Sequence, residues 1–100
     1  MFKVIKSDRR YNGHNHFKYI VDVRRTGDYG ADVFEYNLMR DWCIATWGSS
    51  CELDDWQTLN YKYKEYTINQ NWCWQTEHGN RRIYLRTDKE ANWFKLKYGN

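Results

Sequence analysis

The sequence predicts an α+β domain in which an antiparallel sheet, built from two β-hairpins, has helices packed on one face. Three observations predict it: a strong turn signal near the N-terminus, a second hairpin pattern in the C-terminal half, and helical spacing of apolar residues after each. The 100 residues fit one domain, residues 1–100. Aromatic residues make up 19% of the chain, so large rings are available to form its core.

The first hairpin is predicted from Asn12-Gly13, the dipeptide that a two-residue type I′ turn favours. Apolar residues then face apolar residues across the two strands, and the one charged pair has opposite signs, as cross-strand pairing prefers. The expected pairs are Phe2 with Val23, Lys3 with Asp22, Val4 with Val21 and Ile5 with Ile20.

Two helices are predicted in the middle of the chain. Asp32 and Glu35 form a capping pattern for a helix over residues 33–46, and Gly48 provides its stop. Ser49 and Glu52 predict the start of a shorter helix. The face expected to be buried carries Phe34, Leu38, Met39, Trp42 and Ala45 in the first helix, and Leu53 and Trp56 in the second.

The second hairpin is predicted from strand-forming residues around Tyr66, Ile68, Trp72 and Trp74, followed by a return strand over residues 81–86. Two registers stay open. A turn at Gly79-Asn80 places Trp74 opposite Leu85, whereas a turn at His78-Gly79 places Trp74 opposite Ile83. Residues 57–71 carry few signals and are expected to be irregular.

A last helix is predicted from Thr87 and Glu90, which form a second capping pattern, with Ala91, Phe94 and Tyr98 on its inner side. The alternation of apolar residues and lysines over residues 94–98 also fits a strand. We predict the helix.

The formal net charge of +3 is unevenly distributed along the chain. Residues 1–25 contain seven basic and two acidic residues, residues 26–60 one basic and seven acidic, and residues 61–100 eight basic and four acidic. The blocks can either form faces of opposite charge, which favour a charged partner, or neutralise one another within the fold.

Few residues suggest chemistry. His14 and His16 would point to one side of a strand and suit two metal ligands, but no further ligand stands at a diagnostic spacing, so no metal site is predicted. Either histidine with nearby arginines could serve a metal-independent ribonuclease, the third functional alternative. No phosphate-binding or dinucleotide motif is present, and no cofactor or catalytic residue is predicted.

The cysteines and the hydropathy pattern indicate a cytoplasmic protein. Cys43, Cys51 and Cys73 are too few for a disulfide framework and are expected to be free, packed thiols. No stretch approaches the roughly 20 apolar residues that span a bilayer, so no membrane association is expected.

Binding is the function best supported by the sequence, because aromatic and basic residues interleave in the C-terminal half. This pattern suits stacking on unpaired bases, and the same residue types dominate protein–protein hot spots. At least half of the aromatic rings are expected to fill the core. The predicted binding residues are Tyr61, Tyr63, Trp72, Trp74, Arg81, Arg82 and Arg86.

The stretch Arg82–Gly99 (RIYLRTDKEANWFKLKYG) resembles the ends of small tailed-bacteriophage accessory proteins. In these proteins a short strand precedes an acidic, alanine-containing turn or helix and an aromatic-Lys-Leu close. The resemblance covers less than a fifth of the chain and carries no catalytic residue. It implies a phage-encoded protein that binds, and thereby inhibits, a host enzyme or a defence complex.

The predicted function is therefore non-catalytic binding of a host or defence protein complex. An RNA or single-stranded DNA binding protein is the alternative, and it would show a steep loss of affinity with salt.

Overall fold

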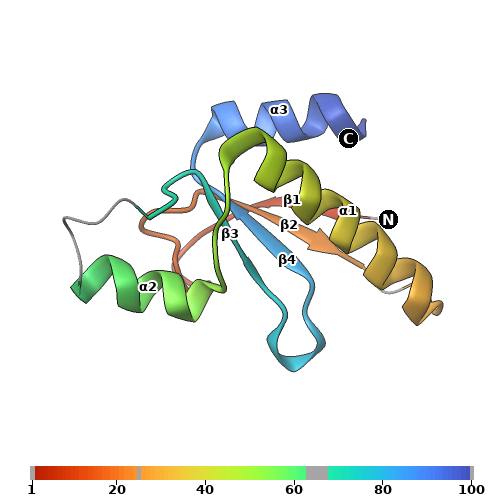
Figure 1. Ribbon diagram of the computed structural model, residues 1–100, viewed down its shortest axis with the longest axis horizontal. Helices are drawn as coiled ribbons and strands as arrows, with labels where there is room; N and C mark the ends of the chain where they lie inside the picture. The colour runs from red at the N-terminus through yellow and green to blue at the C-terminus, as the bar shows by residue number, and fades with distance from the viewer. Residues whose placement is uncertain (1, 25, 63–67, 100) are drawn as a thin grey trace.

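A four-stranded antiparallel sheet lies at the centre of the computed structural model, which describes residues 2–24, 26–62 and 68–99 (Figure 1). The strands follow the spatial order β1-β2-β4-β3. They are β1 (Phe2–Lys6), β2 (Tyr19–Val23), β3 (Trp72–Gln75) and β4 (Arg82–Leu85), and the helices are α1 (Tyr29–Trp47), α2 (Leu53–Lys62) and α3 (Asp88–Tyr98). The predicted α+β class is confirmed.

The first strand pair has the predicted register, but the turn that joins its strands was predicted wrongly. Phe2 pairs with Val23 and Val4 with Val21. The strands are not joined by a two-residue turn, because β1 ends at Lys6 and residues 7–18 leave the sheet in a series of turns. Phe17 is thereby buried, and its ring packs against Trp56 at a centroid distance of 4.7 Å. Burial of this aromatic ring accounts for the departure from the tight hairpin.

The second hairpin adopts one of the two expected registers. Trp74 pairs with Ile83 and Trp72 with Leu85, as a turn centred on His78-Gly79 requires. The connection is longer than two residues and contains a single 3₁₀ turn over Glu77–Gly79. In Figure 1 it projects beyond the sheet as an extended loop between β3 and β4.

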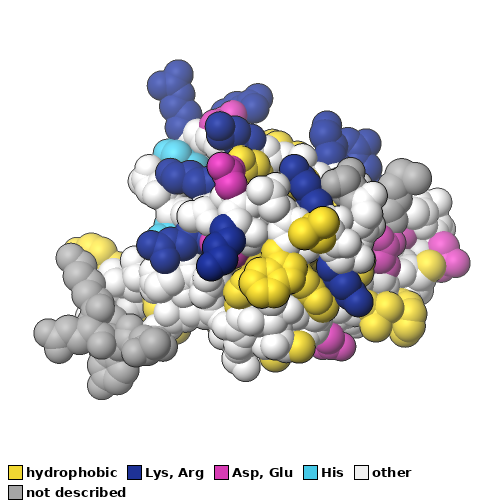
Figure 2. Space-filling view, turned by 90° about the horizontal axis from the view of Figure 1, so that it is seen from above, with side chains coloured by type: hydrophobic (Ala, Val, Ile, Leu, Met, Phe, Trp, Pro, Cys, Tyr) yellow, Lys and Arg dark blue, Asp and Glu magenta, His cyan; other side chains and the backbone are white. Residues whose placement is uncertain are grey.

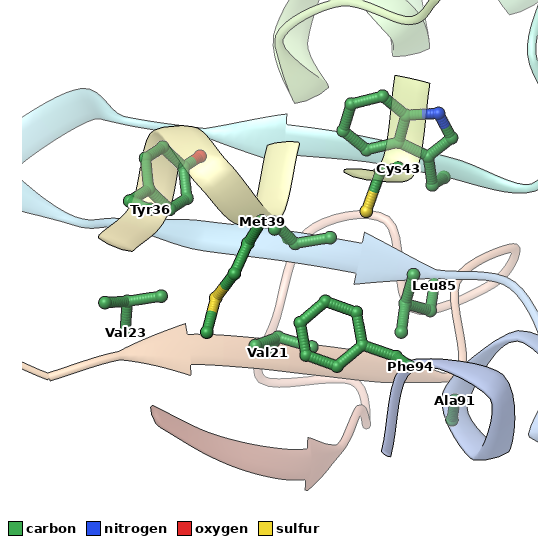
Figure 3. Close-up of a cluster of buried hydrophobic side chains, with 10 residues drawn as sticks. Val21, Val23, Tyr36, Met39, Cys43, Leu85, Ala91 and Phe94 are labelled. Atoms are coloured by element: carbon green, nitrogen blue, oxygen red, sulfur yellow. The ribbon is translucent and has the colours of Figure 1, made fainter. Parts of the chain in front are cut away.

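Helices cover both faces of the sheet, which corrects the expectation of a single covered face. One face of the sheet packs against α1 and α3, and Figure 3 shows Met39, Phe94 and Val21 meeting there. The opposite face packs against α2 and residues 7–18. Its buried cluster consists of Phe17, Ile20, Leu53, Trp56, Cys73 and Tyr84.

Helix α1 begins earlier than predicted and buries a different side. Asp28 is its N-cap and accepts a hydrogen bond from Ala31 N. Asp32 lies inside the helix, where its buried carboxylate accepts hydrogen bonds from Thr26 N and Thr26 Oγ1. The buried side carries Asp32, Tyr36, Met39 and Cys43. Of the predicted set, Met39 is buried and Trp42 is partly buried, whereas Phe34, Leu38 and Ala45 are exposed. Gly48 ends the helix as expected.

The two shorter helices largely follow their predicted patterns. In α2, Leu53 and Trp56 are buried, but the helix continues to Lys62, so the expectation of irregular chain was wrong for residues 57–62. The Glu52 carboxylate accepts hydrogen bonds from Thr76 in the neighbouring loop. The capping box of Thr87 and Glu90 is confirmed and starts α3, so residues 94–98 are helical. Across the described residues, no helix has the length and apolar character needed to cross a membrane.

Replacing Gly13 by alanine is expected to lower the free energy of unfolding by about 2 kcal/mol. Gly13 has a φ of +81°, and a Cβ there would lie 2.9 Å from Leu53 Cδ1. Gly27 is the matched control, because its φ is +95° and a Cβ there meets nothing within 4 Å. Urea denaturation should show a smaller loss for Gly27→Ala, and equal losses would contradict the close approach to Leu53.

Candidate binding surfaces

The predicted aromatic binding residues do not lie on one surface. Trp72 is fully buried between the sheet and the helices, where its Nε1 donates a hydrogen bond to the Gly48 carbonyl at 2.8 Å. Tyr61 is exposed near the end of α2, on the other side of the sheet. Tyr63 lies outside the described residues.

The predicted basic residues are also separated. Arg82 lies on the sheet face that carries α2, beside the ring of Tyr11 and 3.9 Å from the Asp22 carboxylate. Arg86 is exposed just after β4. Arg81 lines a cleft beside the β3–β4 connection, and Trp74 contacts Arg40, another residue that lines this cleft.

The residues considered for catalysis are engaged in packing and main-chain hydrogen bonds. His14 Nδ1 lies 3.1 Å from the Tyr11 carbonyl and His16 Nε2 lies 2.7 Å from the Gln70 carbonyl. Cys43 and Cys73 are buried, and burial raises the pKa of both thiols, which keeps them protonated at neutral pH. Among the described residues, no cluster of three potential metal ligands occurs.

His16 is expected to make the folding stability pH-dependent. Burial lowers the pKa of His16, the hydrogen bond to the Gln70 carbonyl opposes part of this effect, and the nearby charges of Arg86 and Lys18 lower the pKa a little further. The unfolded chain therefore binds this proton more readily than the folded protein. The stability that the neutral, buried His16 contributes to the folded protein is complete above the unfolded pKa of about 6.5. This stability is lost as the pH falls below that value. Between about pH 7.5 and about pH 5.5, wild type should lose more stability in denaturant titrations than His16→Gln. Equal losses would contradict this role.

Helices α1 and α3 run antiparallel over the sheet (Figure 1), and a continuous row of aromatic rings joins them. Trp47 contacts Trp93 at a centroid distance of 6.4 Å and Trp42 at 5.2 Å. Trp42 in turn contacts Tyr98 at 5.9 Å, and the Tyr98 hydroxyl lies 3.5 Å from the Leu38 carbonyl. The row therefore crosses from one helix to the other.

Exposed apolar residues extend this row to form a surface that we call the α1–α3 apolar face. Trp93 is 49% exposed and Leu96, one turn further along α3, is 84% exposed. Phe34 lies one turn before Leu38 on α1, and both are exposed. The face consists of Phe34, Leu38, Trp42, Trp47, Trp93, Leu96 and Tyr98.

Basic side chains border this face. Lys89 and Lys97 lie one turn before and one turn after Trp93 on the same side of α3. Figure 2 shows hydrophobic side chains gathered on the molecule seen from above, with Lys and Arg side chains around them. Asp41 adds one exposed acid on α1. The border is therefore cationic on the α3 side, whereas the α1 side carries Glu35 and Asp41.

Most of the α1–α3 apolar face was not predicted from the sequence, although the helical spacing of the last helix indicated part of it. With Ala91, Phe94 and Tyr98 on the inner side of the predicted last helix, Trp93 and Leu96 fall on its outer side. An outward-facing tryptophan and leucine on a helix of known phase indicate an apolar surface. Phe34 and Leu38 were instead assigned to the core because the phase of α1 was wrong.

A cleft of about 740 Å³ lies on the other side of α1, between its first half and the β3–β4 connection. The Arg40 guanidinium lies over the Trp74 ring, 4.9 Å from its centroid, and the Arg81 guanidinium lies 5.0 Å from the centroid of Tyr29. The lining residues are Gly27, Tyr29, Asp32, Val33, Tyr36, Asn37, Arg40, Thr76, Gly79, Asn80 and Arg81.

Comparison with known proteins adds no relative from which a function could be transferred. No protein-family model, curated protein or solved structure matches the chain. The functional proposal therefore depends on the surfaces described above.

Proposed function

We propose that this protein is a non-catalytic binding protein that docks on a protein partner through the α1–α3 apolar face. The observation that carries the proposal is the continuous row of rings that ends in the half-exposed Trp93, with the exposed Leu96 one turn further along α3. Tryptophan and tyrosine are the residues most often responsible for binding energy at protein interfaces. Burying such a surface against a partner removes apolar area from water.

Aromatic side chains of the α1–α3 apolar face are packed on buried residues beneath them. This ordering lowers the entropic cost of binding. The capping box fixes the start of α3, and Phe94 beneath the face contacts Phe2 and Trp42 edge-on. Side chains that are already ordered lose little freedom when a partner binds. The tight packing of α1 and α3 thus favours a preformed interface.

The chemistry of the border narrows the class of partner. Lys89 and Lys97 flank Trp93, so the complementary surface is an apolar patch bordered by acidic side chains. The resemblance of the C-terminal stretch to phage accessory proteins leads us to propose a bacterial host enzyme or defence complex, bound stoichiometrically in the cytoplasm and thereby inhibited. RNA or single-stranded DNA is the less favoured partner, because Trp72 and Tyr61, two of the residues expected to stack on bases, are buried or isolated.

Leu96→Asp tests the proposal when tagged protein is used to capture partners from bacterial extract. The control is Tyr61→Asp, since Tyr61 is 80% exposed on α2 and Leu96 is 84% exposed on α3. Wild type and Tyr61→Asp are expected to retain the same protein in stoichiometric amounts, and Leu96→Asp to retain at most about a tenth as much, because a buried unpaired carboxylate is costly. Equal retention by both variants would contradict the proposal.

A further inference from the structure

The cleft between the first half of α1 and the β3–β4 connection has the dimensions of a ligand site. Its volume of about 740 Å³ falls within the roughly 300–1,000 Å³ that ligand sites occupy. It is lined by residues from three parts of the chain: the segment before α1, α1 itself, and residues 76–81. None of these residues belongs to the α1–α3 apolar face, so the cleft is a separate site.

Two arginines are held in this cleft by aromatic rings instead of carboxylates. The Arg40 guanidinium lies 4.9 Å from the Trp74 ring centroid and 5.4 Å from the Tyr36 ring centroid, and the Arg81 guanidinium lies over Tyr29. Within the described part of the chain, neither arginine forms an ion pair with a carboxylate. The N–H groups of a guanidinium stacked on an aromatic ring lie in the plane of the guanidinium itself, so they remain available to bind a carboxylate bidentately.

Asp32, the acidic residue that lines the cleft, already has hydrogen-bond partners within the protein. Asp32 is buried, and its carboxylate accepts hydrogen bonds from Thr26 N and Thr26 Oγ1. These bonds, aided by the charge of Arg81, lower the pKa of Asp32 and keep it ionised. Its negative charge offsets part of the charge of Arg81 and leaves the lining with one net positive charge.

The surroundings limit how many negative charges the cleft can accept. Asp28 precedes the lining residue Tyr29, Glu77 follows Thr76, and the Glu52 carboxylate is bonded to Thr76. A nucleic-acid strand requires a continuous cationic path for successive phosphates. These three acids interrupt any such path. The cleft therefore suits a ligand with one or two negative groups on an otherwise neutral chain.

We propose that this cleft binds an acidic peptide segment, with one or two side-chain carboxylates against Arg40 and Arg81. Asn37 and Asn80 line the same cleft, and an asparagine side chain can both donate to and accept from a peptide backbone. Val33 supplies an apolar contact for the peptide chain.

Fluorescence anisotropy with three labelled probes tests this proposal. The probes are a short peptide with two adjacent glutamates, the same peptide with glutamines, and a single-stranded oligothymidylate. Wild-type protein is expected to bind the glutamate peptide at least about tenfold more tightly than the glutamine peptide. Tighter binding of the oligothymidylate, equal binding of the two peptides, or no binding of the glutamate peptide would overturn it.

Arg81→Gln and Arg40→Gln are the test variants, and Arg86→Gln is the matched control because Arg86 is exposed outside the cleft. Each test variant should weaken binding of the glutamate peptide about tenfold, and the control should not. Arg40→Lys keeps the charge but loses the planar fork, so it should also weaken binding. Circular dichroism identifies any variant that does not fold. If Arg40→Gln does not fold, the affinity of Arg81→Gln for the glutamate peptide tests the proposal, since Arg81 packs at the surface against an exposed ring. Equal effects of Arg81→Gln and Arg86→Gln would overturn the proposal.

Discussion

Replacing Trp72 by alanine is expected to lower the free energy of unfolding by about 3–5 kcal/mol. Trp72 has no solvent exposure, its ring lies 5.5 Å from the Trp74 centroid, and its indole N–H donates to the Gly48 carbonyl at 2.8 Å. The substitution removes this hydrogen bond and leaves a cavity in the larger core cluster. Because small domains are stable by only about 5–15 kcal/mol, the loss is a large part of the total.

Tyr61→Ala is the control for this prediction, since both aromatic residues were expected from the sequence to contact a partner. Tyr61 is 80% exposed, so its replacement should change the unfolding free energy by less than about 0.5 kcal/mol. Chemical denaturation followed by circular dichroism measures both changes. A similar, small effect of the two substitutions would contradict the core position of Trp72.

Trp93→Ala is expected to weaken binding to the captured partner by about 30-fold or more, equivalent to about 2 kcal/mol. Trp93 is half-exposed on the α1–α3 apolar face and packs against Trp47, so a partner can bury its outer half completely. In the free protein the same replacement removes only part of a ring from a surface, and the stability should fall by less than for Trp72→Ala.

Titration calorimetry or surface plasmon resonance with the purified partner would measure this loss. Tyr61→Ala again serves as the control, because it also deletes an exposed aromatic ring from a helix. Affinity that is unchanged by Trp93→Ala, or reduced equally by both substitutions, would mean that the partner binds elsewhere.

Strand pairing was the part of the fold that the sequence predicted best. The register of the first hairpin follows from matching apolar and charged residues across its two strands, which is a local property of these segments. For the second hairpin the same matching left two registers open, and the structure adopts the one that pairs Trp74 with Ile83. The connections could not be obtained in the same way. Residues 7–18 follow a path that buries Phe17 against Trp56, and Trp56 lies in a helix distant in sequence.

The phase of α1 was mispredicted for a similar reason. Asp32 resembles a helix cap in the sequence, yet its carboxylate is satisfied by Thr26 and the helix starts one turn earlier at Tyr29. Tyr36 and Cys43 then face the sheet, and Phe34 and Leu38 face solvent. Which side of α1 is buried thus depends on the hydrogen bonds between Asp32 and Thr26, and the spacing of apolar residues alone does not predict them.

The two candidate sites differ in how far the sequence could have identified them. The α3 part of the α1–α3 apolar face follows from helical spacing, because Trp93 and Leu96 lie outside the inner row of that helix. The cleft depends on tertiary structure, because Arg40 meets Trp74, and Arg81 meets Tyr29, only after α1 packs beside the second hairpin.

Site-specific photo-crosslinking tests the central claim, binding through the α1–α3 apolar face, most directly. A photoreactive side chain is placed at Leu96 in one sample and at Tyr61 in another, and each protein is irradiated in bacterial extract. The two positions are exposed to nearly the same degree, 84% and 80%, and lie on opposite sides of the sheet. We expect a single crosslinked protein from position 96 and none from position 61. Crosslinking of the same protein from position 61 alone, or equally from both positions, would contradict the claim.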